Sequence, residues 1–489
     1  MTYILSLDQG TSSSRAIIFD KETNIVNLEQ TEFKQYYPKQ NWVEQSPIEI
    51  WESQLEVAKK VIENNQEKIH SIGITNQRET TIIWDKNTGK AIYNAIVWQD
   101  QRTNKRCDFL KQDFQDIIHK KTGLIINPYF SASKIEWILN HIEGARQKAE
   151  QGDIIFGTVD TWLVWNLTKG KLHITDVSNA SRTMLFNINT LEWDKELLEL
   201  FNIPESILPK VVSSSEIYGK THADILGKAI PISGIAGDQQ AALFGQTCFD
   251  EGMIKNTYGT GCFILMNTGN KPKFSSNGLL TTIAWKTNGQ ITYALEGSIF
   301  MAGAAIKWLR DQLQIINSAS ETEELALSVS DNGGVYIVPA FSGLGAPYWD
   351  SDVNGTVKGL KLSTSKAHIV RATLESIAYR TKDILNLMEE ESKINLLSLS
   401  ADGGASSNQF LMQFQSDILN IDINLPRNTE TTALGAAYLS GLSTGFWTLK
   451  DIQEKHKINK TYQPNMIPQD RAKLFTEWKK TVQNLILSK

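Results

Sequence analysis

The amino-acid sequence predicts an α/β fold. Strand patterns and helix patterns alternate along the chain, which is typical of α/β proteins. Two hairpin-like segments, residues 7–14 and 256–263, each place Gly-Thr at a turn between apolar strands and each open one half of the chain. This echo indicates an internal duplication. Since 489 residues suffice for several domains, we place a boundary in the glycine-flanked connection 245–252 and predict domains 1–248 and 249–489.

The chain begins with three short apolar segments separated by breaks that contain Gly, Ser or Asn, at residues 3–7, 15–19 and 24–28. This pattern predicts a three-stranded meander. A helix follows, because Ser46 and Glu49 have the spacing of a capping box and Pro47 lies at the first helical position. The apolar side chains after it recur at three- and four-residue intervals: Ile48, Trp51, Leu55, Ala58 and Ile62.

Further along the chain, the alternation of strands and helices continues. Residues 69–75 and 80–84 are expected to be strands, and residues 230–235 are expected to form a buried strand that leads into a helix over 239–244. We also expect a strand at 396–399. The apolar spacing of the last segment predicts a closing helix over residues 471–487.

Composition excludes several classes of protein. The net charge of −5 gives no electrostatic reason to expect nucleic acid or an anionic membrane as a partner. The cysteines Cys107, Cys248 and Cys262 are too few and too scattered for a disulfide framework, and a reduced cytoplasm fits best. The apolar segment at residues 3–7 is too short for a secretory signal or a membrane span.

Three polar segments are candidates for chemistry. In residues 8–15, glycine, hydroxyl groups and Arg15 suit phosphate oxygens, and Asp8 suits Mg²⁺. A polar turn that faces solvent explains the same segment equally well. Asp238 is expected at the carboxyl end of a strand, where α/β proteins bind ligands, but it is also a favoured helix N-cap. The adjacent glycines of residues 401–408 permit a flat base to lie on the backbone, although a plain strand-to-helix turn explains them as well.

In this order, the three segments resemble the phosphate-1, phosphate-2 and adenosine segments of the sugar kinase, actin and heat-shock ATPase superfamily. Residues 129–138 and 355–375 resemble the two signatures of the FGGY carbohydrate kinases. The resemblance implies two actin-like, or ribonuclease H-like, α/β domains that flank a central cleft. It covers most of the chain, from about residue 5 to residue 447.

Residues 73–81 and 237–240 are similar to those FGGY kinases that phosphorylate glycerol. The resemblance implies transfer of the γ-phosphoryl group of ATP to glycerol, with Mg²⁺ as cofactor and the first domain on the glycerol side. Asp238 is implied as the general base and Asp8 as the metal ligand. The implied polyol site comprises Thr11, Arg78, Glu79, Trp98, Tyr129, Asp238, Gln239 and Phe263.

The same resemblance implies the nucleotide contacts, which are Thr11, Ser12, Ser13, Arg15, Thr260, Gly303, Lys307, Gly404 and Asn408. Lys307 departs from the family, because many members that phosphorylate glycerol have Gln there. Residues 221–229 lack the glycine-rich, arginine-bearing loop that binds fructose bisphosphate in some members, so we do not expect that feedback inhibition. Self-association into a homodimer or homotetramer is implied by the family.

Three other functions remain open at this stage. The chain could phosphorylate another polyol or a ketose, although Arg78-Glu79 with Tyr129 favours glycerol. A chaperone-like or filament-forming ATPase would use the same nucleotide segments, but only about 80 residues follow the adenosine segment, too few for a peptide-binding domain. A catalytically silent relative is disfavoured because Asp8, Thr11 and Asp238 are all present.

Overall fold

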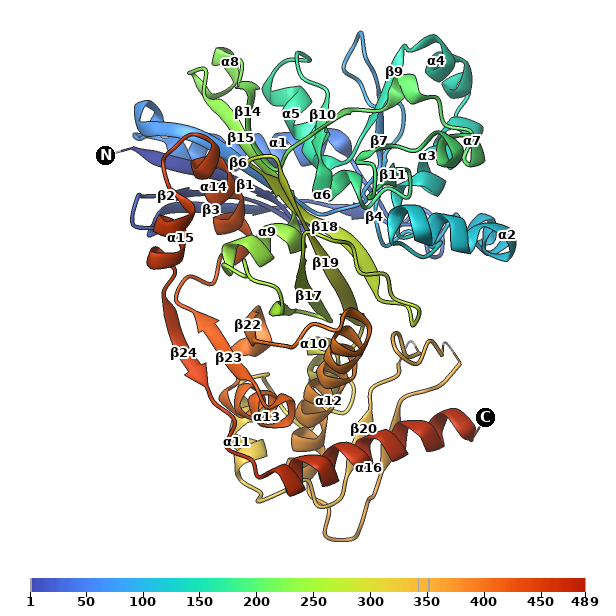
Figure 1. Ribbon diagram of the computed structural model, residues 1–489, viewed down its shortest axis with the longest axis vertical. Coiled ribbons are helices and arrows are strands. Elements are labelled where there is room, and N and C mark those ends of the chain that lie inside the picture. Colours follow the sequence, from blue (N-terminus) through green and yellow to red (C-terminus); the bar gives the residue numbers. More distant parts are fainter. Residues whose placement is uncertain (1, 342, 351, 489) are drawn as a thin grey trace.

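The computed structural model describes residues 2–341, 343–350 and 352–488. Its central feature is a 13-stranded sheet in the order β24-β23-β22-β16-β17-β19-β18-β14-β15-β6-β1-β2-β3 (Figure 1). The strands of this sheet are β1 Tyr3–Gln9, β2 Ser13–Phe19, β3 Ile25–Glu32, β6 Ile69–Asn76, β14 Ser215–Lys220, β15 Pro231–Gly237, β16 Met253–Tyr258, β17 Cys262–Gly269, β18 Leu280–Thr287, β19 Gln290–Ile299, β22 Ser398–Asp402, β23 Asp422–Pro426 and β24 Ile458–Tyr462.

Helices cover the sheet and fill the space around it (Figure 1). They are α1 Pro47–Ile62, α2 Asn104–Thr122, α3 Ser131–His141, α4 Ala145–Gln151, α5 Val159–Leu167, α6 Val177–Ala180, α7 Lys195–Leu200, α8 Ala223–Leu226, α9 Asp238–Gly245, α10 Gly303–Asp311, α11 Glu321–Leu327, α12 Lys366–Ser392, α13 Gln409–Leu419, α14 Thr431–Ser443, α15 Leu449–Lys455 and α16 Pro468–Leu487. The short strands are β4 Gln35–Tyr36, β5 Glu44–Gln45, β7 Ile82–Asp85, β8 Ala95–Ile96, β9 Ile154–Gly157, β10 Ile174–Asp176, β11 Phe186–Asn187, β12 Glu192–Trp193, β13 Lys210–Val212, β20 Tyr336–Val338 and β21 Thr356–Lys358.

The sheet contains the same five-stranded arrangement twice. In the first half, β1 pairs antiparallel with β2, β2 pairs antiparallel with β3, and β6 and then β15 continue parallel to β1. In the second half, β16, β17, β19, β22 and β23 repeat this order and these directions. The internal duplication expected from the two hairpin segments is therefore present, and the α/β class is confirmed.

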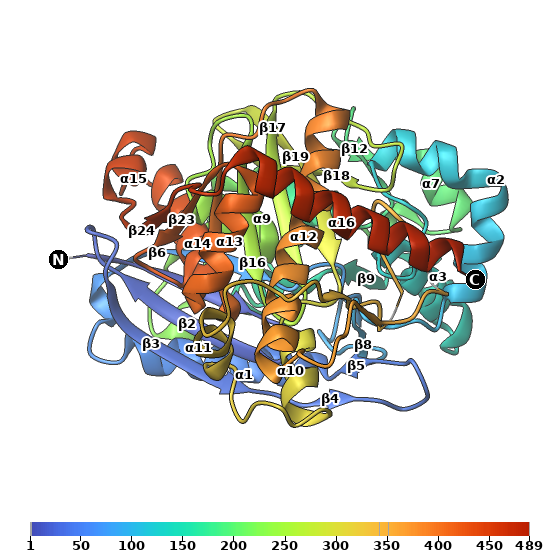
Figure 2. The same cartoon turned by 90° about the horizontal axis from the view of Figure 1, so that it is seen from below.

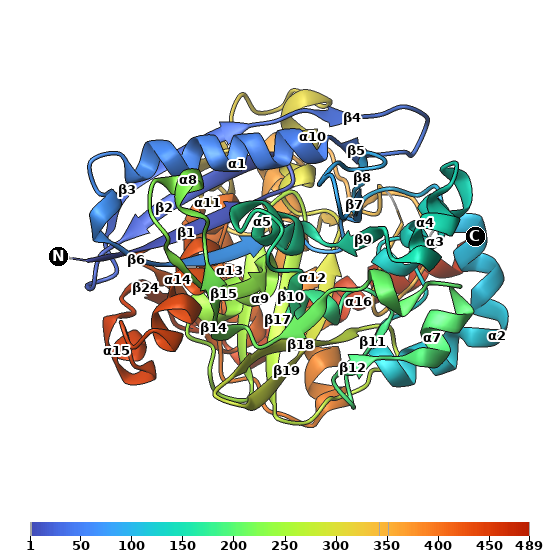
Figure 3. The ribbon, with the colours of Figure 1, turned by 90° about the horizontal axis from the view of Figure 1, so that it is seen from above.

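Helix α1 begins where the sequence predicts and lies along β2 and β3, as Figure 3 shows from above. Ser46 caps it by accepting a hydrogen bond from the backbone N–H of Glu49. The capping box is only half formed, because the Glu49 carboxylate accepts a hydrogen bond from the Tyr36 hydroxyl at 2.6 Å. The side-chain competition for Glu49 was not visible in the local pattern.

The other predicted elements are present with shifted ends. The strand expected at 80–84 is β7, Ile82–Asp85, and the final helix begins earlier, at Pro468. The strand expected at 396–399 is found at Ser398–Asp402 instead. It shifts because β22 pairs with β16 up to Asp402, whereas the Leu397 N–H donates to the Gly252 carbonyl and the Leu397 side chain is exposed.

Helix α14 comes from the second half of the sequence but packs on the first five-stranded unit. The Ser6 hydroxyl donates to the Ala433 carbonyl at 2.7 Å, and the Ser71 and Ser440 hydroxyls are 2.7 Å apart. This close packing requires glycine on β6, because a Cβ at Gly73 would lie 2.1 Å from the Ala436 carbonyl oxygen. Two segments far apart in the sequence thus build one core.

The lower part of the molecule is built around α12, which α16 crosses in Figure 2. The Tyr379 and Trp478 rings stack with centroids 5.3 Å apart, and the Trp478 indole N–H donates to Asp383. All three cysteines are buried and free. Within the described ranges, the helices are too short or too polar to cross a membrane.

We predict that Gly73→Ala lowers the free energy of unfolding by at least about 2 kcal/mol, because the new methyl group meets a backbone oxygen that cannot rotate away. Thermal or denaturant unfolding measures this change. Gly259→Ala is the matched control, since its Cβ would meet nothing closer than 3.7 Å. Equal stability of the two variants would contradict the close approach of α14 to β6.

Candidate active site

The carboxyl ends of three parallel strands bring the first group of predicted residues together. β6 lies between β1 and β15, with Asp8 opposite Thr75 and Gly237 opposite Asn76. After β6 come Gln77, Arg78 and Glu79, and Asp238 follows β15 directly. Because ligands of α/β sheets bind at the carboxyl ends of the strands, this edge is the natural place for a site.

The tip of the first hairpin is held in place by side chains from neighbouring segments. The Trp98 indole N–H donates to the Thr11 hydroxyl at 3.0 Å, and the amides of Gln35 and Gln45 donate to the Thr11 carbonyl at 3.0 and 2.7 Å. Ser12 is exposed at the tip. The turn closes through a hydrogen bond from the Gly10 N–H to the Ser13 carbonyl. The hairpin is therefore a positioned loop rather than a turn without contacts.

Asp8 and Arg15 face each other across this hairpin. Arg15 Nη1 lies 4.0 Å from the Asp8 carboxylate but only 2.8 Å from Glu430, so Glu430 offsets much of its charge. The pKa of Asp8 is raised to about 7; burial is the main cause, Arg15 opposes it, and Asp238 and Glu430 add to the increase. Asp8 and Asp238 stand at the same edge of the sheet, at the ends of the two strands that flank β6.

Arg78 forms a bidentate ion pair that the sequence analysis did not anticipate. Its Nη1 and Nη2 atoms donate to the two oxygens of Glu296, on β19 of the second half, at 2.6 and 3.1 Å. The same Glu296 accepts a hydrogen bond from Arg182 at 2.9 Å, and Arg182 Nε donates to Glu79 at 2.7 Å. Arg78 Nε closes the ring of charges by lying 3.8 Å from Glu79.

This charge network, defined as Arg78, Glu79, Arg182 and Glu296, is buried throughout. Burial alone would raise the pKa of Glu296, but Arg182 and Arg78 outweigh it and hold that pKa at about 2. For Glu79, burial is the largest cause and raises the pKa, although Arg78 and Arg182 oppose it. Glu296 is therefore the ionised centre of the network, and it joins β19 to the segment after β6.

Asp238 lies at the first position of α9, whose N-cap is Gly237. The capping role that the sequence left open for Asp238 is thus taken by its neighbour. One Asp238 oxygen accepts a hydrogen bond from the Gln239 N–H at 2.7 Å and lies 3.3 Å from Arg78 Nε. With 30% of its side chain exposed, Asp238 is the most accessible charge beside the network.

An aromatic cluster adjoins these charges. The Trp98 ring lies 5.3 Å from Tyr129 and 6.5 Å from Phe263, which comes from β17 of the second half. Burial is the main cause that raises the pKa of Tyr129, with Glu79 contributing, so its hydroxyl stays protonated. Gln239, the last member of the predicted polyol set, accepts a hydrogen bond from Lys255.

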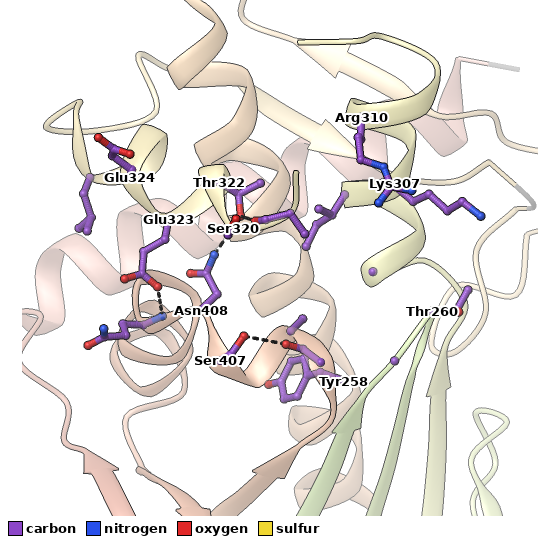
Figure 4. Close-up of a pocket in the computed structure, with 18 of the residues that line it drawn as sticks. Tyr258, Thr260, Lys307, Arg310, Ser320, Thr322, Glu323, Glu324, Ser407 and Asn408 are labelled. Atoms are coloured by element: carbon purple, nitrogen blue, oxygen red, sulfur yellow. Dashed lines mark hydrogen bonds between the residues drawn. The ribbon is translucent and has the colours of Figure 1, made fainter. Parts of the chain in front are cut away.

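The predicted nucleotide contacts of the second half line a pocket of about 1030 Å³ (Figure 4). Lys307 and Arg310 project from α10 on one side of it, and Thr322 and Glu323 belong to α11 on the other. The predicted nucleotide contacts among its lining residues are Thr260, Gly303, Lys307, Gly404 and Asn408. Thr11, Ser12, Ser13 and Arg15 do not line this pocket; they lie at the first hairpin.

The pocket is closed at its base by backbone and side-chain contacts. The Gly303 N–H donates to the Gly259 carbonyl at 3.0 Å, which ties the start of α10 to the turn after β16. The Asn408 side chain accepts from the Leu411 N–H and donates to Thr322 at 3.0 Å. Asn408 thus caps α13 and connects it to α11.

Sequence reasoning missed Glu296, Arg182, Lys255 and Glu430. For two of these residues a signal existed, because Glu296 and Lys255 are lone charged residues inside the apolar strand segments 290–299 and 253–258. Charged residues in such positions are rarely buried unless they are paired or functional. Arg182 and Glu430 lie in segments without any distinguishing pattern.

The residues near Asp8 suit Mg²⁺, which takes few of its ligands from protein, better than they suit a metal ion bound entirely by protein side chains. The described residues contain no group of three or more His, Cys, Asp or Glu side chains that could hold a metal ion. Mg²⁺ uses one or two carboxylates, keeps several waters and takes its other ligands from phosphate oxygens. A buried Asp8 whose ionised form is disfavoured by burial, with Asp238 nearby, is suited to such a cation.

We predict that Glu296→Gln lowers the free energy of unfolding by about 3–5 kcal/mol at pH 7, because it leaves two buried guanidinium groups without their shared carboxylate. The pKa of Glu296 is depressed in the folded protein, so its stabilising effect is present above the ordinary glutamate pKa and is lost as the pH falls toward about 2.

The stability difference between the wild type and Glu296→Gln should therefore shrink as the pH is lowered from 5 toward about 3. Denaturant unfolding at several pH values measures it. Glu477→Gln removes an exposed, ion-paired glutamate and serves as the control, for which we expect little change. A difference that stays constant with pH would contradict the role of the ionised Glu296.

Comparison with known proteins assigns the chain to a family. Models of the FGGY family of carbohydrate kinases match it, with the N-terminal domain at residues 3–245 and the C-terminal domain at residues 254–444. It is 59% identical to glycerol kinase 2 of Thermotoga maritima, over 99% of this chain and 98% of that one, and 60% identical to glycerol kinase of a Thermoanaerobacter species, over 98% of both.

The crystal structure of Plasmodium falciparum glycerol kinase with ADP superposes with a TM-score of 0.96, at 41% identity, over 99% of this chain and 98% of that one. The actin-like two-domain fold expected from the sequence is therefore confirmed. The family models and the full-length relatives agree with each other. The chain belongs to the FGGY family of carbohydrate kinases.

Proposed function

We propose that this protein transfers the γ-phosphoryl group of ATP to glycerol and releases sn-glycerol 3-phosphate and ADP. The observation that carries the proposal is the position of Asp238, an accessible carboxylate held 3.3 Å from Arg78 at the strand ends, with Glu79 beside it. Relatives of nearly the same length and about 60% identity are named glycerol kinases, which supports the same substrate.

The polar groups around Asp238 suit a small triol. Both ion-pair contacts of Glu79 use Oε1, which leaves Oε2 to accept a substrate hydroxyl. We propose that Arg78, Glu79, Tyr129, Asp238 and Gln239 hold the hydroxyl groups. A substrate with a missing hydroxyl would leave buried polar groups unpaired, which discriminates against it strongly.

The aromatic cluster supplies the apolar part of the proposed glycerol site. We propose that Trp98 and Phe263 pack against the carbon atoms of glycerol. Trp98 also holds Thr11 of the hairpin through a hydrogen bond from its indole N–H. The glycerol site and the proposed phosphate loop are thereby linked through one side chain. Phe263 belongs to the second half of the chain, so the proposed site needs both halves.

The transfer step needs one base and an in-line approach. The terminal glycerol hydroxyl oxygen forms a bond to the γ-phosphorus, and the bond from that phosphorus to the β,γ-bridging oxygen breaks, so ADP leaves with the electron pair. The hydroxyl proton goes to an Asp238 oxygen. Positioning and charge stabilisation account for most of such a reaction, and the fixed hairpin and network provide them.

We place the nucleoside of ATP in the pocket of the second half and its phosphates toward the hairpin. Thr260, Gly303, Lys307, Gly404 and Asn408 line the pocket, while Thr11, Ser12, Ser13 and Arg15 are to contact the phosphates. The Asn408 side chain already forms hydrogen bonds within the protein through both its oxygen and its nitrogen. We therefore propose that it contributes by shaping the pocket between α11 and α13.

Asp8 is the proposed protein ligand of Mg²⁺, directly or through water. When bound to ATP, Mg²⁺ neutralises phosphate charge and orients the tail. We further propose that residues 1–248 and 249–489 act as two lobes that close on the substrates and exclude water, which would otherwise compete with glycerol. Assembly into a homodimer or homotetramer stays a prediction, which sedimentation tests.

The proposal is tested by identifying the product after incubation of the protein with Mg-ATP and glycerol. Other polyols and ketoses, offered at the same concentration, form the comparison panel. We expect glycerol 3-phosphate and stoichiometric ADP, with much lower turnover for the other substrates. Efficient phosphorylation of a ketose with no turnover of glycerol would overturn the assignment of the substrate.

We predict that Asp238→Asn lowers kcat by about 10²–10⁴-fold, because the amide cannot accept the hydroxyl proton. Steady-state kinetics with a coupled ADP assay measures the effect. Asp224→Asn, at an exposed position on α8, is the control and should keep wild-type turnover. Near-normal kcat in Asp238→Asn would return this residue to a structural role.

A further inference from the structure

A buried lysine lies between the two parts of the candidate site and has no role in the scheme above. Lys255 is on β16, the strand whose turn lines the nucleotide pocket, and its side chain is fully buried. Its ammonium group donates hydrogen bonds to the Gln239 side-chain oxygen and, at 3.0 Å, to the Thr257 hydroxyl. One of its three N–H donors is left over.

Lys255 also lacks a counter-charge. In the part of the chain that the structure describes, no aspartate or glutamate forms an ion pair with it; its hydrogen-bond partners are the neutral side chains of Gln239 and Thr257. Burying an ammonium group without a partner costs several kcal/mol. Lysine is almost never fully buried in proteins unless its charge is paired, so an unpaired Lys255 favours a negative partner from outside the folded chain.

The electrostatic surroundings keep this ammonium charged. Burial lowers the pKa of Lys255 to about 8, Arg78 lowers it as well, and Asp402, Asp238 and Glu296 oppose them. At neutral pH the protonated form prevails. Asp402, the largest of these opposing charges, forms no ion pair with Lys255; its Oδ2 atom accepts hydrogen bonds from Gln246 and Thr431, and its buried Oδ1 atom has no hydrogen-bond partner.

The location of Lys255 indicates which group compensates it. One of its partners, Gln239, follows Asp238 directly, and the other, Thr257, precedes Tyr258 of the nucleotide pocket. A phosphoryl group that moves from a nucleotide in that pocket to a hydroxyl at Asp238 therefore passes Lys255. Arg15, the cation of the first hairpin, is already engaged by Glu430 at 2.8 Å.

We propose that the Lys255 ammonium group is a catalytic residue that binds the transferring γ-phosphoryl group. It donates a hydrogen bond to a non-bridging γ-phosphate oxygen, stays protonated and gives up no proton, so the bonds made and broken are those of the transfer step above. Its charge opposes the negative charge that spreads over these oxygens in the transition state. The inference rests on the proposed phosphorylation of glycerol.

The test replaces Lys255 by Met, which keeps the volume and removes the charge. We expect kcat to fall by about 10²–10³-fold, as for the loss of one positioned donor in a phosphoryl or acyl transfer site. By isothermal titration, the affinity for ATP should fall more than about tenfold while the affinity for ADP stays within about threefold, because only ATP carries the γ-phosphate. Glycerol affinity should hardly change.

The melting temperature of the ligand-free protein distinguishes this catalytic role from a merely structural role of Lys255. Removing an unpaired buried charge should leave the melting temperature of the ligand-free protein unchanged or raise it. Lys382→Met, a half-buried lysine on α12 whose ammonium donates to the Ile418 carbonyl, is the matched control and should keep wild-type kinetics. Lys255→Gln, which keeps hydrogen bonding without charge, repeats the test should the Met variant not fold.

Equal losses of ATP and ADP affinity, or a kcat within about threefold of the wild type, would overturn the inference. The wild-type protein is assayed with glycerol first, which separates the two proposals. If the wild type does not phosphorylate glycerol, the proposed function has failed and the inference with it. If the wild type is active and the Lys255 variants are equally active, only the role of Lys255 is refuted.

Discussion

The structure depends on one buried interaction: the ionised Glu296 carboxylate pairs with two arginines at once. Two guanidinium groups, those of Arg78 and Arg182, are buried in the interior of the protein, and the Glu296 carboxylate accepts hydrogen bonds from both and so compensates their charge. Glu296 comes from β19 of the second half, while Arg78 follows β6 of the first half. A charge that is expensive to bury therefore fixes the distance between the halves at the point where Asp238 and the aromatic cluster meet.

This constraint explains why a duplicated sheet can make one asymmetric site. Each half repeats the same strand order and offers loops at the carboxyl ends of its parallel strands. In the first half those loops carry Arg78, Glu79 and Asp238, the residues that we propose hold the polyol. In the second half they carry the glycines and the helix starts that line the proposed nucleotide pocket. The halves thus share their strand order and differ in the loops at the strand ends.

Much of this arrangement was readable from the sequence, for physical reasons. The hairpins, α1, β6, β15 and α9 follow from short-range patterns of apolar spacing and capping, and Asp8 and Asp238 stand at strand ends by the same logic. Glu430 and Arg182 could not be found in this way, since an ion pair between residues more than a hundred positions apart leaves no local trace. The bounds predicted for β22 were likewise wrong, because pairing with β16, and not local hydrophobicity, sets where this strand ends.

The most direct measurement of the central constraint is a double-mutant cycle on glycerol affinity. Arg78→Gln, Glu296→Gln and the double variant are compared with the wild type by isothermal titration with glycerol. If Glu296 acts by holding Arg78, each single change weakens binding and the double variant binds no worse than Arg78→Gln alone, a coupling of more than about 1 kcal/mol. Losses that simply add would show that the network does not position Arg78 for the polyol.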